Sequence, residues 1–148
     1  MSGKTYNIFL TDDDYDDRQL FEEAINDIGI NIVFKSFENG VDLMKNLLDA
    51  EIQLPDCIFL DLNMPMMNGE ECLNDIRLES NFTQIPVIIY STLIDSKKVL
   101  ELQTKGADLY LKKPNTFDQL KLALTKCIEF IDFKFRQEIS SNNFVLKY

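Results

Sequence analysis

Histidine and tryptophan are absent from the 148 residues, and glycine, proline and cysteine number only 5, 4 and 3. Without histidine the chain lacks the commonest general base, the residue of histidine phosphotransfer and a ligand of most zinc sites. Cys57, Cys72 and Cys127 lie in apolar stretches without CxxC spacing, so we expect buried, reduced thiols. Chemistry in this chain must therefore depend on carboxylates, hydroxyls and lysine.

Long apolar runs and basic clusters are missing as well. No run approaches the roughly 20 apolar residues of a membrane span, and residues 1–11 lack the features of a secretory signal, so we expect no membrane insertion and a cytoplasmic location. The formal charge of −10 repels nucleic-acid phosphates, which argues against a nucleic-acid partner. Proteins and cations are the expected partners.

Short apolar runs alternate along the chain with longer stretches of helical periodicity, the pattern of βα units that build a parallel sheet. The run at residues 57–62 is nearly continuous in apolar residues, as expected for a strand covered on both faces. We therefore predict an α/β fold with a doubly wound, five-stranded parallel sheet, as one domain over residues 1–148. The expected strands are residues 6–11, 32–37, 57–62, 86–92 and 108–112.

The expected helices carry apolar stripes, and the first stripe runs from Leu20 to Ile28. The last helix is expected to continue past Phe130, so that residues 131–148 form a helical extension and a tail without a separate effector domain. Phe130 and Phe133 fall on a different side from the expected core residues Leu120, Leu124, Ile128 and Ile131. Apolar residues on two sides predict that the extension packs on the domain or on a second subunit, which would make a homodimer.

Polar side chains end four of the five expected strands, and the carboxyl ends of parallel strands share one rim of the sheet. Asp14 and Asp16 can equally be helix caps. Asp12, Asp13 and Asp61 together are different, because clustered carboxylates repel one another unless a cation binds among them, and hard oxygen ligands favour Mg²⁺. The residues that share this rim are Asp12, Asp13, Asp14, Asp61, Ser91, Thr92, Lys112 and Lys113.

A metal, a lysine and a hydroxyl placed around one further carboxylate are what phosphoryl transfer to that carboxylate requires. The carboxylate is the nucleophile, and the cations neutralise the charge of the transferred oxygens. No histidine base is needed, since an ionised carboxylate has no proton to lose. Asp61 fits the nucleophile best.

Four motifs resemble response-regulator receivers, and the resemblance runs from about residue 7 to residue 128. They are TDDD after the first strand, LDLNMPMMNG ending at Gly69, PVIIYST ending at Thr92, and GADLYLKKP ending at Pro114. The resemblance implies a flavodoxin-like fold with strand order 2-1-3-4-5. It also implies a phosphorylation-dependent signalling switch.

The resemblance further assigns roles to single residues. Thr92 stands beside the phosphate site, where receivers usually carry a smaller residue, and the Lys113–Pro114 bond is expected to be cis. The implied roles are an Mg²⁺ site of Asp12, Asp13, Asp61 and the Asn63 carbonyl, Asp61 as phosphoacceptor, Lys113, Ser91 and Thr92 as phosphate-binding residues, and Ser91 with Tyr110 as the switch.

The implied partners are a sensor histidine kinase or a histidine phosphotransfer protein, and a downstream protein that receives the signal. Such a switch is not an enzyme, although it phosphorylates itself with Mg²⁺ and slowly dephosphorylates itself. The alternative is a pseudo-receiver, which keeps the fold as a scaffold and works without phosphorylation.

Two other classes fit less well. A calcium loop starting at Asp12 has Asp17 where the turn needs glycine, and a strand precedes it instead of a helix. A haloacid-dehalogenase-like phosphatase needs a second acid two residues after the nucleophile, where this chain has Asn63.

Overall fold

The computed structural model describes residues 3–93, 95–132 and 144–148. Within these residues five parallel strands form one sheet in the order β2-β1-β3-β4-β5, which confirms the predicted fold. Three strands are shorter than expected: β3 ends at Leu60, β4 runs only from Val87 to Ser91, and β5 begins at Leu109. The end of β3 means that the chain leaves the sheet just before Asp61. The strands are β1 (Tyr6–Thr11), β2 (Ile32–Phe37), β3 (Cys57–Leu60), β4 (Val87–Ser91) and β5 (Leu109–Lys112).

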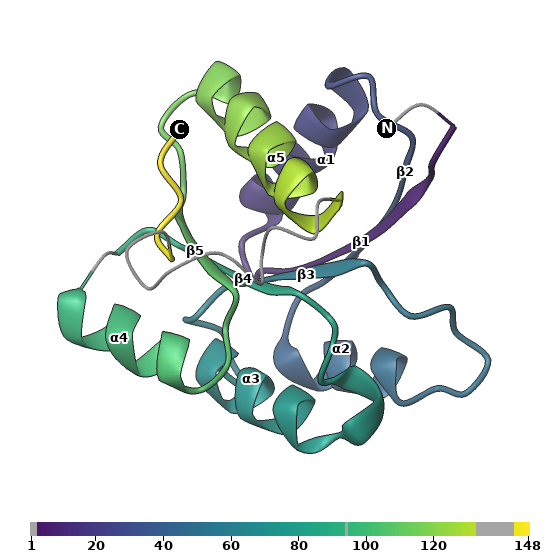
Figure 1. Cartoon of the computed structure of the whole chain (residues 1–148), viewed down its shortest axis with the longest axis vertical. Helices are drawn as coiled ribbons and strands as arrows, with labels where there is room; N and C mark the ends of the chain where they lie inside the picture. The colour runs from purple at the N-terminus through teal and green to yellow at the C-terminus, as the bar shows by residue number, and fades with distance from the viewer. Residues whose placement is uncertain (1–2, 94, 133–143) are drawn as a thin grey trace.

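Helices cover both faces of the sheet (Figure 1). One face carries α1 (Tyr15–Asp27) and α5 (Phe117–Asp132), and the other carries α2 (Gly40–Leu47), α3 (Gly69–Leu78) and α4 (Ser96–Thr104). A short 3₁₀ helix (Ser80–Phe82) follows α3. None of the helices in the described ranges is long and apolar enough to cross a membrane.

Successive residues of each strand point to opposite faces, so the sheet has a core on either side. In β1, Ile8 and Leu10 pack towards α1 and α5, whereas Phe9 packs towards α2 and α3. The stripe predicted for α1 is wrong at Leu20, which is 43% exposed because it lies at the margin of the buried face. Cys57, Cys72 and Cys127 are buried, and none of them forms a disulfide, as expected.

The end of the chain differs from a simple helical extension. Phe130 is buried in the core that also contains Leu120, Leu124 and Ile128, so at this residue the helix packs on the domain, one of the two expected outcomes. Phe133 lies outside the described residues. Residues 144–148 are not helical, because Val145 forms a parallel bridge with Tyr110 of β5.

One arginine joins the end of α3 to the starts of β4 and β5. The Arg77 guanidinium donates hydrogen bonds to the carbonyls of Phe82, Ile85 and Gly106 at 3.0–3.1 Å. It also donates to Asp108 Oδ2 at 3.0 Å, and that oxygen accepts the Val87 N–H at 2.9 Å. A planar cation with several diverging donors is what this arrangement requires.

Arg77→Lys should lower the free energy of unfolding by about 1–3 kcal/mol, because one ammonium group cannot replace four directed hydrogen bonds and leaves buried carbonyls unpaired. Lys97→Arg, which exchanges the same residue types at an exposed position, should stay within about 0.5 kcal/mol of wild type. Urea unfolding of the three proteins measures both effects. Equal midpoints for Arg77→Lys and wild type would contradict the structural role of Arg77.

Candidate functional site

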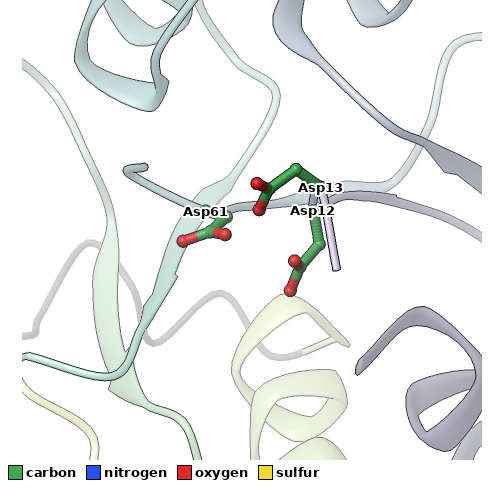
Figure 2. A group of neighbouring side chains, drawn as sticks. All are labelled: Asp12, Asp13 and Asp61. Atoms are coloured by element: carbon green, nitrogen blue, oxygen red, sulfur yellow. The ribbon is translucent and has the colours of Figure 1, made fainter. Parts of the chain in front are cut away.

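Three carboxylates meet where β1 and β3 end. Thr11 pairs with Leu60 in the sheet, and the Asp61 N–H donates to the Thr11 carbonyl at 2.9 Å, so the residues that follow both strands lie side by side. One carboxylate oxygen each of Asp12, Asp13 and Asp61 lies within 4.8 Å of the others (Figure 2). Asp12 and Asp61 are buried, and Asp13 is exposed.

One ammonium group faces this cluster from the end of β5. Lys113 Nζ lies 2.8 Å from Asp12 Oδ2 and 3.6 Å from Asp61 Oδ2. Lys112 is exposed, as expected for neighbours that point to opposite sides of a strand. Lys113 therefore holds the position from which a cation can reach an oxygen bound to Asp61.

Two charged residues that contact this cluster were not predicted from the sequence. Asp17 Oδ2 lies 2.8 Å from Lys113 Nζ, and Arg18 donates to the Asp12 carbonyl at 2.8 Å. Both residues lie in the first turns of α1, where the helix turns them back towards the end of β1. The signal was available in their spacing from Asp14, whose side chain caps the helix by accepting the Asp17 N–H at 3.0 Å.

Burial and charge shift the pKa values of these groups. Burial raises the pKa of Asp61 to about 7, with Lys113 acting against the shift and Asp12 adding to it. Burial also raises the pKa of Asp12, against the effect of Lys113. Burial acts to lower the pKa of Lys113, but its contacts with Asp12 and Asp17 outweigh this and raise it. Burial is therefore the main reason that the pKa of Asp61 approaches neutrality, and Lys113 offsets only part of the shift.

The donor set fits a small divalent cation. Three hard carboxylate oxygens converge, and Asp12 Oδ2 is buried with an ion-pair contact to Lys113 but no aligned hydrogen bond. The Asn63 N–H lies 3.5 Å from Asp61 Oδ1, which keeps the backbone of Asn63 next to the cluster. The role of the Asn63 carbonyl as a fourth protein ligand stays a prediction.

The loop after Asp61 packs against the backbone of this residue. A Cβ on Gly69 would lie 2.2 Å from the Asp61 carbonyl oxygen, so only glycine fits at the start of α3. Asn68 and Glu71 form a capping box that fixes this helix start. Met66, in the same loop, has the positive φ of 69°, which is uncommon for a residue other than glycine.

The predicted switch residues lie beyond Asp61, towards β5. Ser91 is buried, and its Oγ accepts the Leu93 N–H at 3.3 Å, whereas Thr92 is exposed. The Tyr110 hydroxyl donates to the Leu93 carbonyl, and only 1% of Tyr110 is exposed. The structure thus brings Ser91 and Tyr110 together at one loop.

The strand β5 ends with a backbone bond to its neighbour, because the Lys113 N–H donates to the Ser91 carbonyl at 2.8 Å. The expected cis bond between Lys113 and Pro114 is wrong, since this bond is trans. The trans form is the intrinsically favoured isomer of such bonds.

Comparison with known proteins identifies the family. A family model of the response regulator receiver domain matches residues 8–125. Chemotaxis protein CheY-3 of Vibrio cholerae is 26% identical over 127 residues, which cover 86% of this chain and 95% of CheY-3. The transcriptional regulatory protein KdpE of Escherichia coli is 30% identical over 80% of this chain, but the match spans only 49% of KdpE. The histidine kinase mak1 of Schizosaccharomyces pombe is 25% identical over 84% of this chain, and the match spans only 8% of mak1.

Solved structures of response regulators agree with this family assignment. The phosphorylated cyanobacterial phytochrome response regulator RcpA has a TM-score of 0.78 and 27% identity, over 86% of this chain and 94% of RcpA. The Mn²⁺-bound response regulator Rcp1 has a TM-score of 0.73 at 23% identity, over 91% of this chain and 97% of Rcp1, which supports the fold. With its sheet order, its acidic cluster and this match over most of its length, the chain belongs to the response regulator receiver domain family.

Proposed function

We propose that the chain is a phosphorylation-dependent signalling switch that accepts a phosphoryl group on Asp61 from a histidine kinase or a histidine phosphotransfer protein. The observation that carries this proposal is the arrangement around Asp61, a buried carboxylate that lies beside the acidic pair, with Lys113 Nζ at 3.6 Å from Asp61 Oδ2 and 2.8 Å from Asp12 Oδ2. Phosphorylated RcpA, a relative at 27% identity, adds support.

In the proposed reaction an ionised Asp61 oxygen attacks the phosphorus of a phosphohistidine. The new O–P bond forms as the N–P bond breaks, and the imidazole nitrogen keeps the electron pair of that bond. Lys113 neutralises one of the transferred oxygens as a point charge. Deprotonation of Asp61 is the first requirement, because burial raises its pKa to about 7.

Mg²⁺, held by Asp12, Asp13, Asp61 and the Asn63 carbonyl, is the proposed cofactor, and when bound it supplies positive charge to the transferred oxygens. A Mn²⁺-bound relative, Rcp1, supports a divalent cation in general. The same charge favours the ionised form of Asp61. Asp12 and Asp13 thus act as ligands that make Asp61 reactive at neutral pH.

Ser91, Thr92 and Tyr110 are proposed to carry the signal from Asp61 to the surface. A phosphoryl oxygen would draw the Ser91 hydroxyl, which already contacts Leu93, and Tyr110 would follow through its own bond to Leu93. The formal charge of −10 favours output to a protein rather than to a nucleic acid. We propose that the chain forms one receiver domain and that it receives and passes on the signal in the cytoplasm. A homodimer is one way in which it could pass the signal on.

A pseudo-receiver scaffold is the second candidate. Such a protein would keep the sheet and the helices without needing Asp61. The closely spaced charges argue against it, because a buried acidic cluster without a cation destabilises a scaffold that gains nothing from it. Phosphoryl uptake distinguishes the two functions.

Acetyl phosphate should add one phosphoryl group to the wild-type chain when Mg²⁺ is present, and excess chelator should prevent this. Asp61→Asn should take up none, whereas Asp16→Asn, which changes an exposed acid on α1, should react like wild type. Intact-mass spectrometry measures the uptake. Equal uptake in chelator, or on the Asp61→Asn variant, would contradict the proposed site.

Lys113→Ala should abolish the response of Tyr110 to beryllofluoride, a stable phosphoryl analogue, because the ammonium that draws the analogue's charge towards β5 is gone. Lys112→Ala is the matched control and should respond like wild type, since Lys112 is exposed. The NMR signals of Tyr110 report the response. The assignment of Lys113 fails if both variants behave alike.

Asp61→Asn and Asp13→Asn should each be more stable than wild type in chelator by about 1–3 kcal/mol, because each removes one charge from a crowded cluster. Since folding raises the pKa of Asp61 from 3.8 to about 7, the folded chain holds a proton that the unfolded chain releases. The wild type should therefore lose stability as the pH rises between these values, and the advantage of Asp61→Asn should grow.

Denaturant melts at several pH values measure these differences. Mg²⁺ should stabilise the wild type by binding the folded state, and should stabilise Asp13→Asn much less. Two variants that are both less stable than wild type in chelator would mean that these carboxylates are ordinary caps, whose loss costs about 1 kcal/mol.

A further inference from the structure

The C-terminal tail (residues 144–148) lies along the free edge of the sheet. β5 is the last strand in the sheet order, so among the described residues no further strand of the sheet lies on its outer side. Figure 1 shows the tail, in yellow, beside β5. An edge strand exposes N–H and C=O groups that another extended segment can pair with.

The backbone of Tyr110 makes this pairing. Its N–H donates to the Phe144 carbonyl at 2.9 Å, and its carbonyl accepts the Leu146 N–H at 2.9 Å. Val145 thereby forms a parallel bridge with Tyr110. Two further bonds hold the tail, from the Tyr148 hydroxyl to the Lys112 carbonyl at 3.1 Å and from Lys126 Nζ to the Lys147 carbonyl at 3.2 Å.

The tail also closes both cores at this edge. Phe144 is 3% exposed and packs, with Val145, into the core beneath α3 and α4, while Leu146 packs against the core beneath α5. The rings of Phe144 and Tyr110 lie 6.4 Å apart in an edge-to-face arrangement. Apolar side chains on both sides of the sheet therefore fix the tail, in addition to its backbone bonds.

The Tyr110 side chain links the tail to the candidate phosphoacceptor site. Its hydroxyl donates to the Leu93 carbonyl, and the Leu93 N–H donates to Ser91 Oγ at 3.3 Å. A cavity of about 230 Å³, lined by Asn63, Ser91 and Tyr110 among others, lies on this path. With the tail in place, Tyr110 is buried and already bonded to the loop that follows Ser91.

We propose that the C-terminal tail is an intramolecular strap that holds Tyr110 in its inward position, so that the tail and a phosphoryl group on Asp61 stabilise the same state of the switch. The coupling rests on the proposed phosphorylation of Asp61. The strap itself rests on the contacts between Tyr110 and the tail. Because coupling between two sites is reciprocal, releasing the tail must weaken phosphoryl binding, and phosphoryl binding must tighten the tail.

Leu146→Pro in the full chain is the direct test, because proline removes the N–H that donates to the Tyr110 carbonyl. Lys147→Pro is the matched control, since it places the same residue in the tail but leaves both bonds to Tyr110 in place. Phe144→Ser is a second variant, which removes the ring and keeps the backbone. Circular dichroism confirms that each variant is folded.

Two measurements follow on each protein, amide hydrogen exchange by NMR and the affinity for beryllofluoride with Mg²⁺. Exchange at the Tyr110 amide should be about tenfold faster in Leu146→Pro and in Phe144→Ser than in wild type, as expected for a bond that opens locally. The amides of Asp108 and Lys113, which donate to β4, should keep their rates. Both variants should bind beryllofluoride at least about fivefold more weakly, the lower end of the usual range of coupling, and Lys147→Pro should match wild type.

Unchanged exchange at Tyr110 in Leu146→Pro and Phe144→Ser would overturn the strap. Faster exchange with unchanged beryllofluoride affinity would overturn its coupling to the switch. Failure of the wild type to bind beryllofluoride would instead contradict the proposed function, and exchange at Tyr110 would still decide whether the strap exists.

Discussion

Repulsion among carboxylates at one end of the sheet is the constraint on which the rest of the structure depends. The strand register places Asp12 next to Asp61, and both are buried. In the described part of the chain the Lys113 ammonium faces them, and it also pairs with Asp17. An arrangement of this kind costs folding free energy in water-poor surroundings, and the surrounding fold must compensate for it. The close contact of Gly69 with the Asp61 backbone and the buried strands β3 and β4 provide the rigid frame that keeps these charges together.

β5 connects this charged rim to the edge of the sheet. Lys113 follows its last residue and reaches the carboxylates, while Tyr110, three residues earlier, contacts the loop after Ser91 and the tail. The backbone bond from Lys113 to Ser91 ties the two regions together. A change of charge at Asp61 therefore acts on one short strand, and that strand meets both the loop and the tail through directed bonds.

Sequence patterns predicted the features that follow from strand ends. Apolar runs placed the strands, and the topology of parallel sheets then brought Asp12, Asp13, Asp61 and Lys113 to one rim. Asp17 was missed because the apolar periodicity of α1 does not report on its polar residues; the signal lay in the spacing of Asp17 from the cap at Asp14. The bridge between Val145 and Tyr110 was missed for another reason, since a pairing between distant segments leaves no local pattern in a stretch of only a few residues.

The tail also decides how the sheet meets other molecules. The unpaired backbone groups of an edge strand can hydrogen-bond to a strand of another molecule. Proteins prevent this by covering the edge with another segment, by placing charged side chains on it, or by β-bulges. With residues 144–148 lying on β5, β2 is the other outermost strand. Beside the exposed Val33 it presents the exposed polar residues Lys35 and Ser36, and a charged side chain on an edge strand disfavours pairing with the edge of another sheet. The edge at β5 is therefore covered by a segment of the chain itself, whereas the edge at β2 has only exposed side chains such as Lys35. Loss of the tail would uncover the backbone groups of β5 and the apolar side chains that the tail packs against, which would favour self-association at this edge.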